Sequence, residues 1–249
     1  PRINAALRDQ LERLDHVLLA GCTHAPVVEL SERLAALAPG GLGHVFYASD
    51  GAAATEIALK MSFHYWRNRG FPDKNSFASL VGGYHGETLG ALGVTDVALF
   101  RDAYGPLLRS PALLPCPDAR HGITVEAACA ALEAHLAAHH ATTAALILEP
   151  LVQGAAGMVM YDAAYLAQAR AITARHGVHL IADEIMTGFG RTGTLFAWEQ
   201  AQAPAPDFMC LSKGITGGVL PLSCVLTSDD IFAAFYDDEA LPQLAAHFF

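Results

Sequence analysis

The chain has 249 residues, of which 53% are hydrophobic and 16% charged, so it can bury a large core, and this composition argues against intrinsic disorder. Its formal net charge is −10 and its Lys and Arg residues form no cluster, which argues against nucleic acid or an anionic membrane surface as a partner. Five widely spaced cysteines without a CxxC pair indicate free thiols in a reducing cytoplasm. No initiator Met is present, and we expect that the sequence is part of a longer protein.

Short apolar runs alternate with longer helical patterns, which predicts an α/β fold. Residues 1–43 are predicted to be an N-terminal helical segment that leads into a large domain at 44–249. Strands are predicted at residues 44–48, 77–82, 112–114, 145–148, 179–182, 208–211 and 223–227. Helices are predicted at residues 52–68, 89–94, 125–139, 163–176 and 229–236. Thr124 is expected to cap one of these helices, and Gly177 to close another.

Lys213 follows the predicted strand 208–211 and is surrounded by Ser212 and several glycines. A lysine at the end of a buried strand is costly unless chemistry uses it. Its amine can act as a nucleophile or form a Schiff base, and small neighbours would let a flat cofactor approach. The alternative is a surface lysine in a glycine-rich turn, and Lys213 taken alone favours that alternative.

Asp183 follows the predicted strand 179–182. In parallel sheets ligands bind at the carboxyl edge, so a strand-end acid and Lys213 can face one another there. A pyridoxal-phosphate (PLP) enzyme needs such a pair, because the acid keeps the pyridine nitrogen protonated while the lysine holds the cofactor. The alternative is that Asp183 or Glu184 merely ends the strand and caps the next segment of the chain.

Two further strand ends carry small or aromatic residues. Gly51 and Ala52 open a long helix, where backbone N–H groups can bind phosphate, although Asp50 can cap the same helix and would repel an anion. Tyr84, flanked by glycines, can lie flat on a planar ring. His85 and Glu87 beside it could suggest a metal site, but a third ligand is missing at any usual spacing, so no metal is predicted.

Residues 188–193, Gly-Phe-Gly-Arg-Thr-Gly, match the G-x-G-x-x-G pattern of dinucleotide-binding proteins. A true fingerprint directly follows a strand and opens a helix, whereas here the residues from Asp183 to Thr187 intervene. We therefore reject NAD binding and interpret this segment as an active-site loop. The sequence contains neither a P-loop nor a G-x-S-x-G elbow.

Taken together and in this order, these segments resemble the class III, fold type I, PLP-dependent aminotransferases from about residue 44 to residue 227. The resemblance implies a large domain with a mostly parallel seven-stranded sheet and helices on both faces, and a small C-terminal domain outside this sequence. The segments that carry it are Glu149-Pro150-Leu151-Val152-Gln153-Gly154, Asp183-Glu184-Ile185-Met186-Thr187-Gly188 and Leu211-Ser212-Lys213-Gly214.

The resemblance also assigns expected roles to residues. Lys213 would form the Schiff base with PLP and contact substrate, and Asp183 would pair with the pyridine nitrogen. Ile185 would pack on one ring face and Tyr84 near the other face and the substrate. Gly51 and Ala52 would donate backbone hydrogen bonds to the phosphate, and His85, Glu149 and Gln153 would lie behind the residues that touch the cofactor. At Ala52 the family often has Ser or Thr, so one phosphate hydrogen bond would be lost.

A narrower resemblance is to the biotin-synthesis branch of this family. It rests on Gly83-Tyr84-His85-Gly86-Glu87-Thr88, Gly157-Met158-Val159-Met160-Tyr161 and Ile215-Thr216-Gly217-Gly218. This branch implies S-adenosylmethionine and 8-amino-7-oxononanoate as small-molecule substrates, and a cytoplasmic homodimer when full length. The alternatives are another class III ω-amine aminotransferase or an aminomutase, and a PLP-free, non-catalytic homologue.

Overall fold

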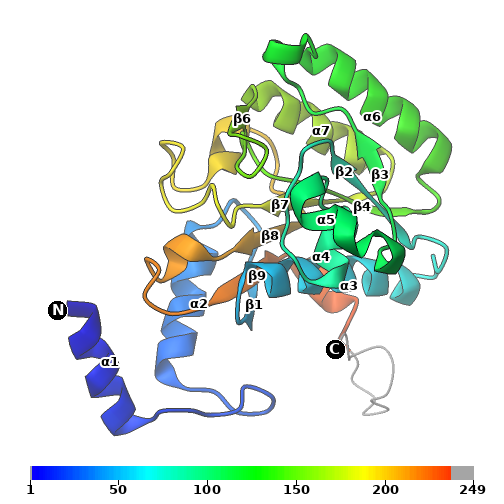
Figure 1. Ribbon diagram of the computed structural model, residues 1–249. Helices are drawn as coiled ribbons and strands as arrows, with labels where there is room; N and C mark the ends of the chain where they lie inside the picture. Colours follow the sequence, from blue (N-terminus) through cyan, green and yellow to red (C-terminus); the bar gives the residue numbers. More distant parts are fainter. Residues whose placement is uncertain (1, 237–249) are drawn as a thin grey trace. The chain divides into compact units, whose positions relative to one another are not determined.

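The computed structural model describes residues 2–236, and the chain divides into two compact units at residues 37 and 38 (Figure 1). The first unit contains helix α1 (Arg2–Arg13) and helix α2 (Ala25–Leu37). Pro26 lies in the first turn of α2, where its missing N–H removes no helical hydrogen bond. Among residues 2–236, no helix is both long and apolar enough to cross a membrane.

The second unit is built on a seven-stranded sheet with the strand order β1-β9-β8-β7-β4-β2-β3. β9 runs antiparallel to both of its neighbours, while every other neighbouring pair is parallel, so the predicted mostly parallel sheet is confirmed. The strands are β1 (His44–Ala48), β2 (Ser76–Leu80), β3 (Ala112–Leu114), β4 (Thr143–Leu148), β7 (His179–Asp183), β8 (Phe208–Leu211) and β9 (Ser223–Thr227).

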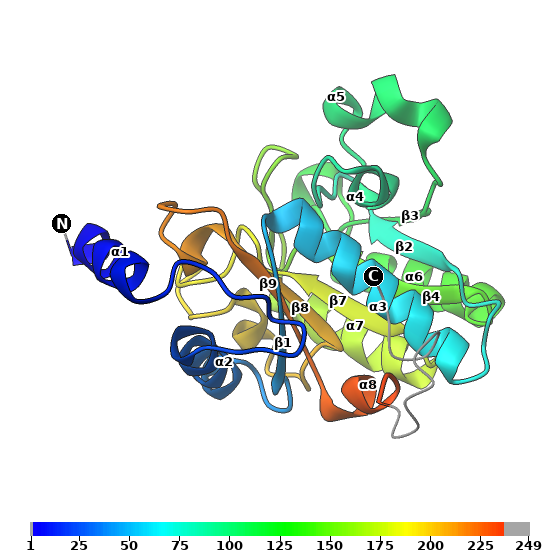
Figure 2. The same cartoon turned by 90° about the horizontal axis from the view of Figure 1, so that it is seen from below.

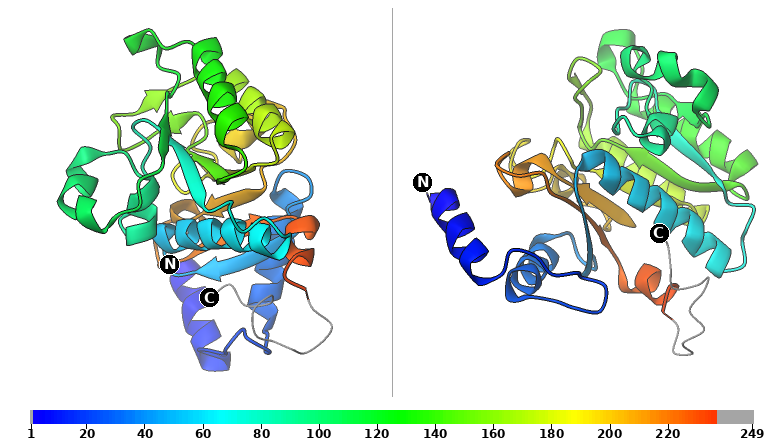
Figure 3. Two further views of the ribbon diagram at one scale, coloured as in Figure 1. Left: turned by 90° about the vertical axis from the view of Figure 1, so that its right-hand side faces the viewer. Right: turned by 60° about the horizontal axis from the view of Figure 1, so that its bottom comes forward.

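Helices cover both faces of this sheet, as predicted (Figure 2, Figure 3). Helix α3 packs on β8, β9 and β4 from one side, whereas α6 and α7 pack together on the other. Ala54 and Ala58 of α3 are fully buried, and their small side chains allow close approach to the sheet. The helices of this unit are α3 (Gly51–Asn68), α4 (Leu89–Val94), α5 (Ala98–Arg101), α6 (Val125–His139), α7 (Ala163–Arg175) and α8 (Asp229–Ala233).

The core beneath α3 is made by alternate residues of the central strands. Ile147 of β4, Ile181 of β7 and Phe208 of β8 are fully buried in one cluster with the α3 alanines. Burial of each large apolar side chain stabilises the fold by about 1.5–3 kcal/mol. The same strands are buried on their other face too, which explains why β4, β7 and β8 consist of buried residues throughout.

The sequence prediction fails at a few boundaries. β2 ends at Leu80 rather than at residue 82, because Gly82 adopts φ +76° and Gly83 N donates to Leu80 O, which turns the chain away. Helix α8 ends at Ala233, three residues before its predicted end. The two-residue strands β5 (Val152–Gln153) and β6 (Val159–Met160) were not predicted, since two residues show no alternation. The expected caps are confirmed: Thr124 accepts from Ala127 N, and Gly177 follows α7 in the left-handed conformation.

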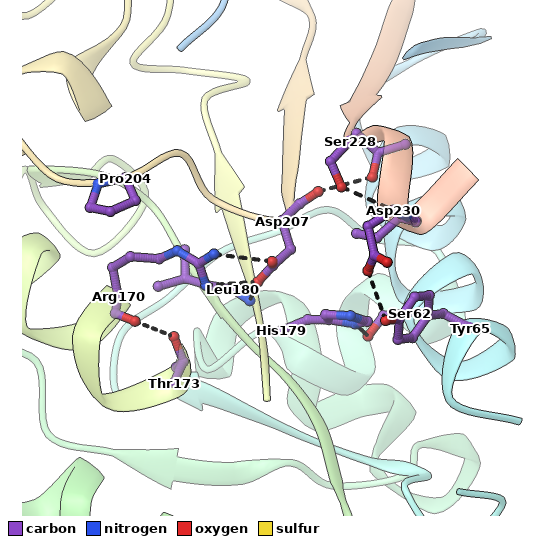
Figure 4. A network of polar contacts seen from close by, with 12 residues as sticks. Ser62, Tyr65, Arg170, Thr173, His179, Leu180, Pro204, Asp207, Ser228 and Asp230 are labelled. Atoms are coloured by element: carbon purple, nitrogen blue, oxygen red, sulfur yellow. Dashed lines mark hydrogen bonds and ion pairs between the residues drawn. The ribbon is translucent and has the colours of Figure 1, made fainter. Parts of the chain in front are cut away.

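A buried polar network lies at the amino ends of the parallel strands, opposite the edge where the predicted site residues lie (Figure 4). His179, the first residue of β7, hydrogen-bonds to Ser62 Oγ through Nδ1 at 2.9 Å and stacks on Trp66. Burial lowers the pKa of His179 to about 3, with a smaller effect of the Lys74 and Arg170 charges. His179 is therefore neutral in the folded chain at pH 7.

Asp207 anchors the start of β8 in the same network (Figure 4). Its carboxylate accepts two hydrogen bonds from the guanidinium of Arg170, at 3.1 and 3.2 Å, and a third from Leu180 N at 2.7 Å. The Asp207 backbone oxygen accepts from Thr227 Oγ1 at 2.9 Å. Asp207 thus joins α7, β7 and β9 at the amino edge.

We expect Asp207→Ala to lower the free energy of unfolding of the intact protein by about 2–4 kcal/mol, because Arg170 and Leu180 N would lose their acceptor. Denaturant titration measures this change. Asp229→Ala is the matched control, since its side chain is 95% exposed and its pairing with His44 contributes at most about 1 kcal/mol. Equal effects of the two substitutions would contradict the anchoring role of Asp207.

The buried, neutral His179 should make the free energy of unfolding decrease at acidic pH. Its folded pKa of about 3 lies below its ordinary value of 6.5, so the unfolded chain binds an extra proton between these values. The stabilisation by neutral His179 is complete above pH 6.5 and is lost as pH falls toward 3, at up to about 1.4 kcal/mol per pH unit. In pH-dependent denaturation, the stability gap between wild type and His179→Asn should narrow as pH falls from 7 to 4. A constant gap would contradict this assignment.

Candidate active site

Asp183 is held rigidly at the carboxyl end of β7. Its side chain is 3% exposed. Oδ1 accepts from Ile185 N at 3.0 Å, and Oδ2 lies 2.7 Å from Nδ1 of the fully buried His85 side chain. Because an ionised carboxylate only accepts, the proton of His85 lies on Nδ1, and the carboxylate cannot rotate without losing both bonds.

Lys213 lies just past the neighbouring strand. Asp183 is paired with Cys210 of β8, three residues before Lys213, so the acid and the lysine lie at the same sheet edge, as predicted. The chain leaves β8 at Ser212 and turns into a short 3₁₀ helix, η4 (Lys213–Ile215). As a result Lys213 is exposed in this chain, and the expectation of a burial cost at this position is wrong.

One cavity of about 660 Å³ brings the predicted site residues together. It lies at the amino end of α3 and the carboxyl ends of β7 and β8. Its lining includes Gly51, Ala52, Tyr84, His85, Glu149, Asp183, Ile185 and Lys213. These include every residue that was predicted to touch the cofactor or the substrate.

Gln153 lies beside a different cavity. Its Nε2 donates to Val81 O at 3.0 Å, and its side chain lines a separate space of about 430 Å³ with Cys116 and Ile123. Gln153 thus fixes the end of β2 from behind and does not line the first cavity.

The start of α3 leaves its first backbone N–H groups at the cavity. Asp50 caps the helix by accepting from Ala53 N at 3.0 Å, while Gly51 and Ala52 line the cavity. A Cβ atom at position 51 would lie 3.0 Å from Ile185 Cγ2, so a larger residue there would push against the Ile185 side chain. The positive end of the helix dipole therefore faces the cavity beside an aliphatic side chain.

Glu149 supports the opposite wall. Its side chain is buried, Oε2 accepts from Tyr84 N and Oε1 from Gly154 N, each at 3.1 Å. Burial raises the pKa of Glu149 to about 7, against the lowering effect of His85. Glu149 ties the loop after β2 to the loop after β4, and its position behind a bound cofactor stays a prediction.

Tyr84 makes a contact that sequence reasoning missed. Its hydroxyl donates to Glu87 Oε1 at 2.9 Å, whereas Glu87 was considered only as a metal ligand. Burial has the largest effect on the pKa of Tyr84 and this hydrogen bond the next largest; together they raise it to about 12, so the hydroxyl stays protonated.

Over residues 2–236, no group of three or more His, Cys, Asp or Glu side chains is placed to hold a metal ion.

Glu184, rather than Asp183, has the capping role that the sequence analysis gave as the alternative for these two acids. It is fully buried and accepts from Trp198 N and Ala197 N, which open the 3₁₀ helix η3 (Ala197–Ala201). Burial raises its pKa to about 7, although the hydrogen bonds oppose this shift. The acid that caps a later segment of the chain is therefore Glu184, while Asp183 faces the cavity.

These residues fit pyridoxal phosphate. The cavity offers a carboxylate fixed from behind by His85, an aliphatic surface at Ile185 for a flat ring, and an open helix terminus for a phosphate. Lys213 lines the same cavity and supplies the amine.

Comparisons with known proteins agree with this chemistry. Residues 1–241 match the family described as Aminotransferase class-III. The chain is 46% identical over 235 residues to adenosylmethionine-8-amino-7-oxononanoate aminotransferase of Helicobacter pylori, and the match covers 94% of this chain and 53% of that protein.

Solved structures show the same fold. The enzyme of the same name from Methanocaldococcus jannaschii has 34% identity and a TM-score of 0.88, and the match covers 95% of this chain and 53% of that one. An (S)-enantioselective omega-transaminase from Thermomicrobium roseum has 36% identity and a TM-score of 0.87, with 99% and 57% coverage. This chain spans about half the length of these relatives, and it belongs to the class III aminotransferase family.

Proposed function

We propose that the intact protein is a PLP-dependent aminotransferase that transfers an amino group from S-adenosylmethionine to 8-amino-7-oxononanoate in biotin synthesis. The observation that carries the proposal is that Asp183 and Lys213, from adjacent parallel strands, line one cavity with the amino end of α3. The name of the Helicobacter pylori relative supports the choice of substrates.

Bound pyridoxal phosphate supplies an electron sink for the charge left when a proton leaves the carbon that bears the amino group. The Asp183 carboxylate holds a proton on the pyridine nitrogen, and His85 and Ile185 N keep that carboxylate in place. The backbone N–H groups of Gly51 and Ala52 bind the phosphate.

Lys213 has two tasks in this proposal. Its Nζ would hold the cofactor covalently until the donor amine arrives in the cavity. Neutral Nζ would take the proton from the substrate carbon and, once protonated, would donate it to the cofactor carbon as a general acid. Exposure of Lys213 at the cavity gives the side chain the freedom to move between these positions.

A second substrate class has its own support. The omega-transaminase of Thermomicrobium roseum is as similar to this chain in sequence and fold as the Methanocaldococcus jannaschii enzyme. A class III enzyme acting on other ω-amines is therefore the main alternative, and an aminomutase or a PLP-free homologue are the others. We further propose that the intact enzyme is a cytoplasmic homodimer.

Replacing Lys213 tests the PLP chemistry. We expect Lys213→Ala in the intact protein to lose the visible absorbance band of the bound cofactor and to lower the transamination rate by about 10²–10⁴-fold, the usual contribution of a general acid–base group. Lys60→Ala is the matched control, because Lys60 lines another cavity. An unchanged spectrum in Lys213→Ala would exclude Lys213 as the attachment point, and failure of the wild type to bind PLP would favour the PLP-free homologue.

The amino donor separates the remaining alternatives. With 8-amino-7-oxononanoate as acceptor, we expect S-adenosylmethionine to support product formation at a kcat/KM at least about 10²-fold above that of a simple primary amine, because a site built around one donor's polar groups discriminates strongly. Product is measured by mass spectrometry. The reverse preference would assign the protein to the ω-amine aminotransferases, and formation of an isomer without any acceptor would indicate an aminomutase.

A further inference from the structure

The buried carboxylate next to Asp183 is fully engaged on the side away from the cavity. Glu184 is 0% exposed. Its Oε1 accepts from Trp198 N at 2.7 Å, and its Oε2 accepts from Ala197 N at 3.1 Å and from Thr187 Oγ1 at 2.6 Å. Two of the partners are backbone N–H groups, which can only donate, and in this arrangement the Thr187 hydroxyl donates as well, so the carboxylate accepts all three bonds.

These bonds close the loop between β7 and η3 at both of its ends. Thr187 lies near the beginning of the loop, and Ala197 and Trp198 lie at its end. The Glu184 backbone takes part too, because its carbonyl accepts from Gly188 N at 2.9 Å. A Cβ atom at position 188 would lie 2.8 Å from that carbonyl oxygen, so a residue other than glycine would force the loop to shift here.

The closed loop presses an aromatic ring against the turn that carries Lys213. Phe196, fully buried next to Ala197, packs edge-on against Phe189 with ring centroids 5.8 Å apart. Phe189 in turn contacts Gly214, where a Cβ atom would lie 2.7 Å from Phe189 Cβ. A continuous series of contacts therefore runs from Glu184 to the residue after Lys213.

The backbone of Lys213 shows that this turn is constrained. Lys213 has φ +42°, a left-handed conformation that a residue with a Cβ atom adopts only when its surroundings impose it. The ring of Phe189 lies against the following glycine and limits how the turn can relax.

We propose that Glu184 is a positioning residue for Lys213: its carboxylate closes the 185–198 loop, and Phe189 of that loop holds the Lys213 turn in place. The proposal rests on the function proposed above for Lys213 and extends it to the group that fixes the lysine's backbone. Glu184 itself touches neither the cavity nor the reacting atoms.

The test compares three variants of the intact protein. Glu184→Gln keeps the shape of the side chain but presents an amide N–H₂ to one of its donors. Phe189→Leu shortens the contact with Gly214 and leaves Glu184 untouched. Glu199→Gln is the matched control: Glu199 lies in the same segment and accepts one hydrogen bond, from Phe196 N at 3.0 Å, but it is exposed.

The first readout is amide hydrogen exchange in the cofactor-free protein. We expect Glu184→Gln to accelerate exchange by at least about tenfold at residues 197 and 198 and also at Ile215 and Gly217, whose N–H groups close the Lys213 turn. Phe189→Leu should accelerate exchange only at Ile215 and Gly217. Glu199→Gln should leave Ile215 and Gly217 as in the wild type.

The second readout is steady-state kinetics of the loaded enzyme. Glu184→Gln and Phe189→Leu should each lower kcat by about 10- to 100-fold through misplacement of Lys213, with KM changed by less than about twofold. The double variant should lower kcat by less than the product of the two single-variant factors, because both substitutions act on one series of contacts.

The proposal is overturned if Glu184→Gln accelerates exchange at residues 197 and 198 while Ile215, Gly217 and kcat stay as in the wild type. It is equally overturned if Phe189→Leu leaves the Lys213 turn unchanged, and this second variant decides the question should Glu184→Gln fail to fold. If the wild type catalyses no transamination, the proposed function fails, but hydrogen exchange still decides whether Glu184 controls the turn.

Discussion

The parallel pairing of β7 with β8 is the constraint on which the site depends. It sets Asp183 opposite Cys210, and so it brings the carboxylate and the turn at Lys213 to one edge of the sheet. A slip of one residue would send Asp183 to the opposite face of the sheet and out of the cavity. β9 holds β8 from its other side, where Leu211 pairs with Cys224, and Asp207 fixes the start of β8 against β7. The separation of acid and lysine is thus set by packing and hydrogen bonds far from the cavity.

Two consecutive acids are buried at this edge, and each has its own donors. Asp183 is satisfied by His85 and Ile185 N, whereas Glu184 is satisfied by backbone groups that begin η3. Burial of two neighbouring carboxylates is unfavourable, and the Asp183 charge adds to the rise in the pKa of Glu184. The arrangement is stable only because the donors are preorganised by the fold. At the end of β7, Asp183 therefore faces the cavity, while Glu184 holds the loop that leads to η3.

Much of this could be predicted from the sequence because the signals are local. Runs such as residues 208–211 and 223–227 match the observed strands. The residues that follow the predicted strands were sufficient to identify much of the cavity lining. The features that could not be predicted depend on contacts between distant segments. The exposure of Lys213 results from the η4 turn, and the pairing of Tyr84 with Glu87 results from the side-chain direction in a loop. Gln153 carries the family's sequence pattern, yet it packs behind β2, which no local pattern reveals.

The glycine-rich segment 188–193 shows that one sequence pattern can serve different kinds of contact in different proteins. In a dinucleotide-binding turn the glycines let backbone approach a pyrophosphate at a helix terminus. Here the first of them, Gly188, is required by the approach of its own backbone to the Glu184 carbonyl, and the residue between the first two, Phe189, adopts φ +62° and points its ring at Gly214. The glycines therefore serve contacts within the protein. This G-x-G-x-x-G segment lies five residues beyond β7 and opens no helix, so it has no helix terminus to offer a phosphate. In the proposed function the start of α3, which lines the cavity, binds the phosphate instead.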